Sequence, residues 1–291
     1  MIKSNYNEGG IWLKGNLHTH TVNSPCGHYT IETVIDMYKA YKMKYDFLAI
    51  TDHFFLTDLA RYMEDSSLIL FQGTEYKKGD FQTLGINIKK YDDDENNIDN
   101  HNEVFLDVKS QGGFNIICHP HAFRDDYWPF ERLMQLENYI GIEIFNNNVK
   151  HDNKGRAVAT DLWDKLLSSG KKIFGFANDD MHVFSRAGGA FNMVLAKEKT
   201  REQILASIFK GAFYCSSGVF IENIKNEGSL IEVKASKLPV SFRFIGKHGR
   251  ILKECEGFVG SYECKGDEAY VRVELIREDG AKAWTQPFWI S

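Results

Sequence analysis

Histidines and carboxylates recur in short motifs along this chain. His18 and His20 lie two residues apart at the end of an apolar run, so on an extended strand both imidazoles point to the same side and can reach one cation. Further candidate ligands occur downstream in similar motifs: Asp52, His53, Glu75, His119, Asp180 and His182. Nitrogen and oxygen donors of these types suit Zn, Mn or Fe. The pattern predicts a metal site assembled from distant parts of the chain.

The composition indicates an ordinary globular protein. The chain has 291 residues, of which 43% are hydrophobic and 26% charged, enough for a large domain with or without a small one. No run approaches the roughly 20 apolar residues that a bilayer requires, and the first residues lack an apolar signal core, so we expect a cytoplasmic protein with no membrane partner. Five scattered cysteines argue against a disulfide framework. Nucleic acid is not the favoured partner, because the net charge is −5 and no basic stripe is interleaved with aromatics.

Apolar runs of strand length alternate with helical patterns over the first two thirds of the chain. The expected strands are 15–18, 47–51, 68–73, 84–88, 114–118, 141–145, 172–176 and 191–196. A helical stripe follows Thr30, a candidate N-cap, and further stripes lie between the other strands. Strands that alternate with helices predict a parallel sheet covered by helices.

The candidate ligands fall at or just beyond the carboxyl ends of these expected strands, and so does Asn146. In an α/β barrel those ends converge on one rim, where residues far apart in sequence meet. An open doubly wound sheet binds ligands only near its switch point and does not easily gather contributions from six or more strands. We therefore expect an α/β fold built as a barrel or distorted barrel.

The pattern changes after about residue 219. Apolar and polar residues alternate over 240–245 and 271–276, and Glu278-Asp279-Gly280 is typical of a hairpin turn. Helical periodicity is absent there. We expect two domains: a barrel that carries the metal site over residues 1–219 and a small antiparallel β module over 220–291 that carries no chemistry.

Five of these motifs, at 16–20, 47–53, 73–75, 118–120 and 180–182, occur in an order that resembles the PHP (polymerase and histidinol phosphatase) family of metal-dependent phosphoesterases. The resemblance covers roughly residues 12–218. It implies a distorted (β/α)7 barrel that holds two or three divalent ions, usually Zn, Mn or Fe, at its carboxyl rim. The tail over 283–289 is similar to a stand-alone subgroup whose members include carbamate-ester hydrolases.

The resemblance also implies how the ligands are shared. The first ion would be bound by His18, His20, Glu75 and Asp180. Glu75 would bridge to a second ion held by His119, while His53 and His182 would be available for the remaining positions. Asp52 would lie in or just behind this shell. We do not expect His101 or His121 to be primary ligands.

Two departures from the family pattern leave the third metal position open. Many members have Ser-Asp-Gly after the first histidine pair, whereas this chain has a loop that ends in His28, which could replace that donor. Residues 79–82 also differ from the Gly-His that related chains often have at this place. Arg124 and Arg186 each follow a metal motif by four or five residues, where a guanidinium either faces an anionic substrate or points to solvent.

Three functions are compatible with these residues. The leading prediction is hydrolysis of a small phosphate ester by a water that two ions activate, with His28, Asp52 or another water protonating the leaving group and Arg186 near the substrate. The second is hydrolysis of a carboxylic or carbamate ester at the same site. Converging basic side chains would favour phosphate, and an aromatic pocket with Trp128, Phe54 or Phe55 a neutral ester. The third is a metal-binding interaction module without turnover.

Overall fold

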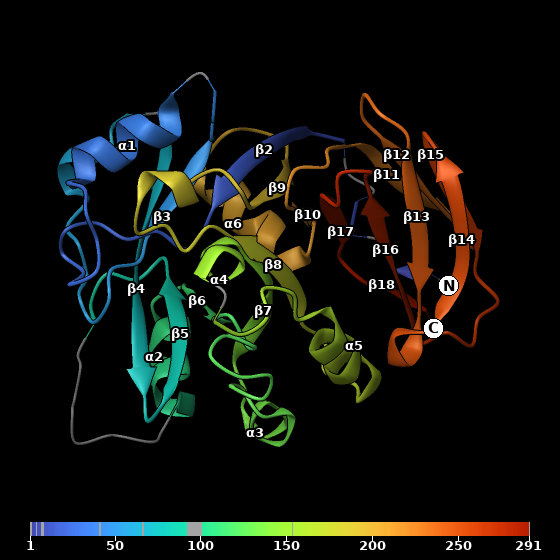
Figure 1. The fold of residues 1–291 in the computed structure, drawn as a ribbon, viewed down its shortest axis with the longest axis horizontal. Coiled ribbons are helices and arrows are strands. Elements are labelled where there is room, and N and C mark those ends of the chain that lie inside the picture. Colours follow the sequence, from blue (N-terminus) through green and yellow to red (C-terminus); the bar gives the residue numbers. More distant parts are fainter. Residues whose placement is uncertain are drawn as a thin grey trace.

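An α/β part and an antiparallel β part lie side by side in the computed structural model (Figure 1). The structure describes residues 2–3, 5–6, 9–40, 42–65, 67–91, 101–152 and 154–290. The mixture of parallel strands and covering helices confirms the predicted α/β class. No helix in the described ranges has the length and apolar character that crossing a bilayer demands.

Parallel strands form most of the sheet in the α/β part. The parallel pairs are β2–β3, β3–β4, β6–β7 and β7–β8. Their bounds are Ile11–Asn16 for β2, Phe47–Ile50 for β3, Ile69–Lys78 for β4, Phe114–Ile117 for β6, Tyr139–Asn146 for β7 and Phe174–Asn178 for β8. Every residue of β3 and β6 is buried, which explains why these strands are continuous apolar runs without alternation.

Two strands run against the predicted direction. Strand β5 (Phe81–Ile86) is antiparallel to both β4 and β6, and β9 (Phe191–Ala196) is antiparallel to β2 and β10 (Phe213–Ser216). Only Gly79 and Asp80 separate β4 from β5. A parallel crossover needs a dozen or more residues, so a link this short forces a hairpin. The expectation of a wholly parallel sheet is therefore wrong at these two strands.

Side-chain amides take the place of backbone pairing where the sheet would close. Within the described residues, no strand pairing joins β8 to β9 or β10. Instead, the Gln286 amide accepts a hydrogen bond from Gly175 N (2.9 Å) and donates one to Gly175 O (2.8 Å). The Asn192 amide does the same for Ala177, at 3.2 and 3.0 Å. The buried polar groups of β8 are thus satisfied without a closed ring of strands.

Helices surround the sheet and begin where the sequence signals them. The side chain of Thr30 accepts a hydrogen bond from Thr33 N, as predicted for the N-cap of α1 (Ile31–Lys39). The other helices are α2 (His101–Ser110), α3 (Phe130–Gln135), α4 (Asn147–Asp152), α5 (Thr160–Ser168) and α6 (Arg201–Lys210), with short 3₁₀ turns at Ala60–Tyr62 and Phe184–Arg186. Leu162 and Leu166 of α5 are buried in the core of the α/β part.

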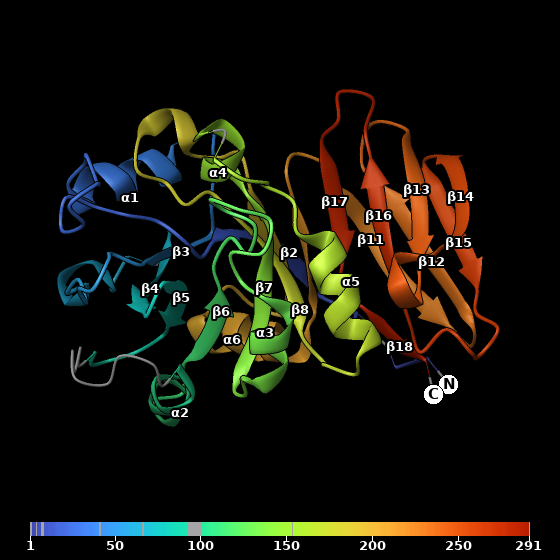
Figure 2. The ribbon, with the colours of Figure 1, turned by 60° about the horizontal axis from the view of Figure 1, so that its bottom comes forward.

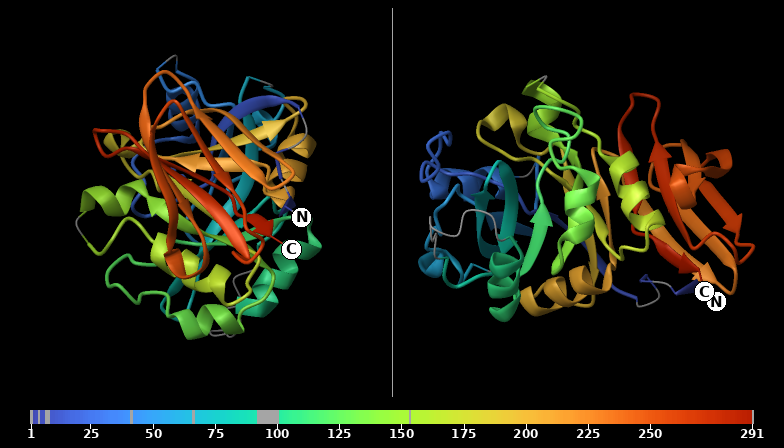
Figure 3. Two further views of the ribbon diagram at one scale, coloured as in Figure 1. Left: turned by 90° about the vertical axis from the view of Figure 1, so that its right-hand side faces the viewer. Right: turned by 90° about the horizontal axis from the view of Figure 1, so that it is seen from below.

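Antiparallel strands make up the C-terminal part. They are β11 (Ile221–Glu227), β12 (Leu230–Ala235), β13 (Val240–Ile245), β14 (Ile251–Gly257), β15 (Val259–Glu263), β16 (Tyr270–Ile276), β17 (Lys282–Thr285) and β18 (Phe288–Ile290). Residues 277–281 form the predicted hairpin turn between β16 and β17. Strand β17 also pairs with β10, and β1 (Ile2–Lys3) pairs with β18, so the N-terminal strand lies beside the C-terminal one (Figure 3).

A buried ion pair connects the two parts. Helix α5 packs beside the C-terminal strands (Figure 2), and its Asp164 accepts two hydrogen bonds from the guanidinium of Arg272 on β16, at 2.7 and 2.6 Å. The hydroxyl of Tyr270 donates a third at 3.0 Å. Both charged side chains are almost fully buried. A bidentate pair of this kind fixes the orientation of α5 against β16.

Candidate metal centre

The predicted ligands converge at the carboxyl ends of the strands. His18 and His20 follow β2, His53 follows β3, and Glu75 lies on β4. The others, His119, Asp180 and His182, follow β6 and β8. Single β-bridges between Thr19 and Met181 and between His53 and Glu75 hold neighbouring segments together at this rim.

Four donor atoms form the centre of the cluster. His18 Nε2 lies 3.1 Å from Glu75 Oε2 and 3.2 Å from Asp180 Oδ1. His20 Nε2 lies 3.3 and 3.2 Å from the same two oxygens. All four side chains are buried. Their ligand atoms lie within 4.8 Å of one another, so a single ion can touch all of them.

Hydrogen bonds at the far side of each ring determine which nitrogen faces the centre. His18 Nδ1 lies 2.8 Å from Glu143 Oε1, and an ionised carboxylate only accepts, so Nδ1 carries the proton there. Ser24 Oγ donates to Asp52 Oδ1 at 2.7 Å, so at 3.0 Å it accepts from His20 Nδ1. Both rings therefore direct Nε2 at the carboxylates. Such partners behind a histidine are typical of metal ligands.

Two atoms at the centre have no hydrogen-bond partner among the described residues. They are His20 Nε2 and Asp180 Oδ1, and both are buried. A lone pair of His20 would face two carboxylate oxygens, which is unfavourable unless a cation or a proton lies between them. The donor set of two imidazoles and two carboxylates suits a divalent transition ion. The residues present therefore fit the metal that the sequence predicts.

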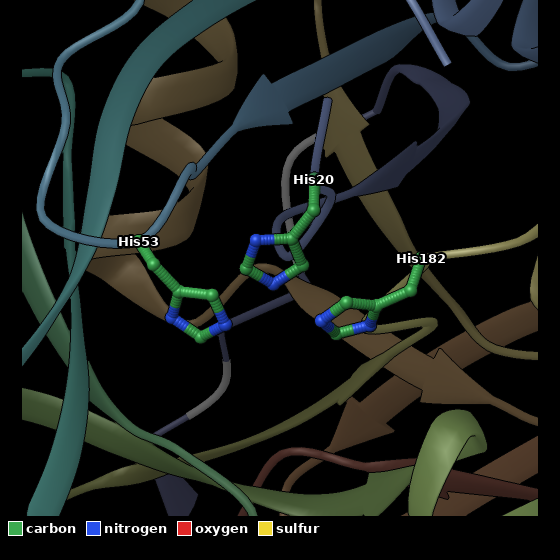
Figure 4. A group of neighbouring side chains, drawn as sticks. All are labelled: His20, His53 and His182. Carbon is green, nitrogen blue, oxygen red and sulfur yellow. The ribbon is translucent and has the colours of Figure 1, made fainter. Parts of the chain in front are cut away.

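Two further groups flank this one. His20, His53 and His182 gather on one side, where the His20 ring lies between the other two, with centroids 4.5 Å from His53 and 4.2 Å from His182 (Figure 4). On the other side, Glu75 is grouped with Cys118 and His119, whose Nε2 lies 3.3 Å from Glu75 Oε1. Because His20 and Glu75 are each shared, the three groups form one continuous set of donors.

Burial and mutual attraction shift the pKa values of this cluster in opposite directions. Burial alone would lower the pKa of His18, but Asp180, Glu75 and Glu143 raise it well above its usual value. Burial alone would raise the pKa of Glu75, yet His18, His53 and His119 hold it well below its usual range. The attraction between the imidazoles and the carboxylates thus favours the charged form of both.

The backbone at two of the predicted ligands adopts a conformation that residues with a side chain rarely take. His119 has φ +25° and Asp180 has φ +51°. Positive φ values cost free energy for residues with a side chain and persist where the surrounding structure holds them. At His119 that hold includes Glu143 Oε2, which accepts its N–H at 2.8 Å. At Asp180, the Asn146 amide donates to Oδ2 at 3.2 Å.

Asp52 lies behind the cluster and is not among its ligand groups. Its oxygens accept hydrogen bonds from the hydroxyls of Thr21, Ser24 and Thr57 and from the N–H of Thr21, at 2.5 to 2.7 Å. These donors take its lone pairs, which places Asp52 just behind the cluster, one of the two positions that the resemblance implies; its role as a ligand or acid stays a prediction. The loop that carries Thr21 and Ser24 turns at Gly27, where a Cβ would lie 1.8 Å from Thr21 O.

His28 and Arg186 also lie apart from the ligand groups. His28 is exposed on the loop after β2 and belongs to none of the three groups, so the structure does not bring it together with the other predicted ligands; its role as a ligand or acid stays a prediction. Arg186 Nη2 donates to Asp152 Oδ1 at 2.8 Å, so its charge is compensated beside the site. His101 and His121 stand outside the groups, as expected, and His121 faces Asp161 at 3.3 Å.

Glu143 is the functional residue that the motifs missed. It is fully buried on β7, and its oxygens accept hydrogen bonds from His18 and the amides of Asn146 and Asn178. Burial alone would raise its pKa, but the charge of His18 lowers it. The available signal was a single carboxylate inside the apolar run 141–145, because a buried charge is costly without a partner.

Two cavities open outward from the donors. The inner one has a volume of about 180 Å³, and its lining includes five of the predicted ligands (His53, Glu75, His119, Asp180 and His182) together with Gln82, Phe123 and Lys154. The outer one, of about 590 Å³, is lined by residues that include Phe54, Lys77, Arg124 and Tyr127. Trp128 is buried and donates a hydrogen bond to Gln82 O, so it does not form the aromatic pocket that the sequence allowed.

Comparisons with known proteins agree with this architecture. No family model matches the sequence, and no curated protein does. Among solved structures, the chain is similar to a two-domain protein from Bacteroides vulgatus that contains a predicted PHP-like metal-dependent phosphoesterase. That similarity covers 98% of both chains at 17% identity, with a TM-score of 0.57. The fold is thus of the PHP-like kind.

Two other solved structures are similar over part of the chain. PsfC from Pseudomonas syringae is 12% identical over 68% of this chain and 88% of its own, with a TM-score of 0.44. Endonuclease Q, solved with a 27-mer duplex that carries an abasic lesion, is 15% identical over 70% of this chain and 58% of its own, with a TM-score of 0.48.

Proposed function

We propose that this chain is a PHP-family hydrolase that uses two or three divalent ions to cleave a small phosphate ester. The observation that carries the proposal is the meeting of His18 Nε2, His20 Nε2, Glu75 Oε2 and Asp180 Oδ1 within hydrogen-bond distance, with no cationic Lys or Arg side chain among them. The like-charged carboxylates need a cation between them, and two flanking donor groups extend the set. The PHP-like fold supports the same assignment.

Each part of the site has a distinct task in this proposal. The three donor groups would hold the ions, which supply Lewis acidity and an activated water. Glu143 and Ser24 fix the rings of His18 and His20 from behind. Lys154 lines the inner cavity and places a positive charge where an anionic ester would lie.

The test compares metal-loaded wild type with variants of the central group. Protein stripped by a chelator and reloaded with Mn or Zn should hydrolyse 4-nitrophenyl phosphate, whereas Asp180→Ala and His20→Ala should each lower kcat/KM by about a thousandfold. His248→Ala is the matched control, because His248 lies on the C-terminal part away from the donors. Equal turnover by wild type and both site variants would contradict the proposal.

A neutral carboxylic or carbamate ester is the second candidate. It is favoured by one observation: Lys154 is the single Lys or Arg among the described residues that line the inner cavity, while phenylalanines line the outer one. Measuring the hydrolysis of 4-nitrophenyl acetate beside that of 4-nitrophenyl phosphate separates the two candidate ester classes. The ester that wild type prefers should no longer be hydrolysed by Asp180→Ala. Metal binding without turnover of either ester would support an interaction module instead.

A further inference from the structure

The wall of the outer cavity presents two phenylalanines on strained backbone. Phe54 and Phe123 both line it, with 47% and 61% of their surface exposed. Their φ values are +54° and +66°, in the left-handed region. Bulky residues rarely occupy this region, because a positive φ costs free energy. Exposing the ring to water does not offset that cost. A ring held this way at a cavity wall points to a ligand.

Contacts with the metal-site loops hold both phenylalanines in place. Phe54 directly follows His53, its N–H donates to Glu75 O at 3.0 Å, and its ring stacks on that of His53 with centroids 6.0 Å apart. Phe123 donates its N–H to Lys154 O at 3.0 Å, and its ring meets Tyr127 edge-on at 5.2 Å. The positions of both rings therefore depend on the loops that carry the donors.

The two cavities differ in size and chemistry but share a wall. His53, Gln82 and Phe123 line both, so the cavities are neighbours. The inner volume of about 180 Å³ is less than a third of the outer one, so a phosphoryl group fits the inner cavity and a larger organic group needs the outer one. The outer volume of about 590 Å³ lies in the range of small-molecule sites.

Charge does not dominate the outer cavity. Lys77 Nζ lies 3.8 Å from Asp80, and Arg124 Nε lies 3.2 Å from Asp126. Both cations are therefore compensated by neighbouring carboxylates at the rim. The side chains of this wall that have no such partner are the two exposed phenylalanine rings, Phe54 and Phe123.

We propose that Phe54 and Phe123 determine specificity by binding a planar, apolar organic group of the substrate in the outer cavity while its phosphate lies in the inner one. This inference rests on the proposed phosphoesterase function. Aromatic rings bind flat groups by stacked or edge-on contacts. Each ring should then contribute about a three- to tenfold preference for a flat group over an aliphatic one.

The test uses two phosphate esters of similar primary alcohols, 2-naphthylmethyl phosphate and ethyl phosphate. Wild type should prefer the naphthylmethyl ester, and Phe54→Ala and Phe123→Ala should each raise its KM about three- to tenfold. The KM of ethyl phosphate should rise less than that of the naphthylmethyl ester in both variants, because ethyl phosphate has no flat group for the rings to bind. Phe258→Ala, which removes an exposed ring on the C-terminal part, is the matched control. Metal content is measured for every variant, because Phe54 adjoins a ligand.

Binding of 2-naphthylmethylphosphonate, which has no ester bond to hydrolyse, separates this inference from the function. Wild type that turns over neither ester but binds the phosphonate, with binding weakened in both variants, would overturn the phosphoesterase function and leave the aromatic site standing. Turnover of both esters with no change in KM or phosphonate affinity in either variant would overturn the aromatic site and leave the function standing. If Phe54→Ala loses its metal, its kinetics no longer report on the ring alone, and the result for Phe123→Ala decides whether the aromatic site stands.

Discussion

Two clusters of buried charged side chains in the described part of the chain differ in how their charges are compensated. Between α5 and β16, Asp164 and Glu274 face Arg272, Lys282, and hydrogen-bond donors from Tyr270 and Trp284. At the metal centre, the carboxylates of Glu75, Asp180 and Glu143 face imidazoles and amides. The first cluster carries its own permanent cations. In the second cluster the imidazoles are the groups that can carry a positive charge, and an imidazole becomes neutral when it loses a proton.

This difference shows what each cluster is for. Arg272 has one nitrogen, Nη1, without a hydrogen-bond partner, but that atom still lies 3.8 Å from Glu274 Oε2. His20 Nε2 and Asp180 Oδ1 lack partners at the point where four ligand atoms meet. A compensated cluster stabilises the contact between two parts of a fold, whereas an uncompensated one is prepared for an ion from outside. Four predictions test this contrast.

Breaking the compensated pair should have the largest effect on stability. Arg272→Met leaves Asp164 buried without its cation and should lower the free energy of unfolding by about 3–5 kcal/mol, measured by urea denaturation. Adding Asp164→Leu should restore most of this loss, because no unpaired charge then stays buried. Arg243→Met is the matched control: its pair with Glu254 is exposed, so the change should stay below about 1 kcal/mol. A single variant as stable as wild type would remove the contrast.

Supplying the missing cation should stabilise the other cluster. At about one hundred times the dissociation constant, Mn or Zn should raise the free energy of unfolding by about 2.7 kcal/mol, because the ion binds the folded chain. The Arg272→Met protein should show the same increment from a lower starting point. Asp180→Asn should lose it, since one of the four central ligand atoms becomes a neutral amide. An increment that survives Asp180→Asn would place the ion elsewhere.

Removing a positioning hydroxyl should weaken the metal without touching a ligand. Ser24 Oγ accepts hydrogen bonds from His20 Nδ1 and His53 N and donates its own to Asp52 Oδ1. Ser24→Ala should therefore lower metal affinity by about 10- to 100-fold, measured by competition with a chromophoric chelator. Ser241→Ala, on a strand of the C-terminal part, should have no effect. A metal affinity of Ser24→Ala within twofold of wild type would show that the Ser24 hydroxyl does not position the site.

The sequence predicted strand positions better than strand directions. Buried strands such as β3 and β6 are continuous apolar runs, and these are visible in a single chain. Apolar patterns carry no information on direction, so β5 was read as parallel although only two residues separate it from β4. The hydrogen bonds of Gln286 and Asn192 to β8 were equally unpredictable, since they depend on long-range contacts of two amides.

Ligands were predictable where type and spacing repeat, and positioning groups were not. His18 and His20 are recognisable because residues two apart on a strand point to the same face. Asp52 has the same residue type as Asp180, and only the folded loop shows that hydroxyls take its lone pairs. Glu143 lies within the apolar run 141–145 of β7 and no second candidate ligand repeats its spacing, so no motif marked it. The division of the chain near residue 219 stays a prediction.

The smallest expected effect concerns pH and the compensated cluster. Glu274 Oε2 accepts a hydrogen bond from Trp284 Nε1 at 2.9 Å, and Oε1 accepts one from Lys282 Nζ at 2.8 Å. Burial alone would raise its pKa, but Lys282 and Arg272 bring it below the usual 4.5. A lowered pKa means that the ionised carboxylate stabilises the fold above pH 4.5 and that this contribution is lost as the pH falls through the lower folded value.

Glu274→Gln should therefore be about 1–2 kcal/mol less stable than wild type at pH 7. The gap should narrow as the medium is acidified below pH 4.5, because the wild-type side chain then becomes neutral as well. Urea denaturation of both proteins across that range measures the gap, and the exposed Glu254→Gln serves as control. The metal centre titrates identically in both proteins, so it cancels from the difference. A gap that widens in acid would mean that Lys282 and Arg272 do not hold Glu274 ionised, and the two clusters would no longer differ in how they bury charge.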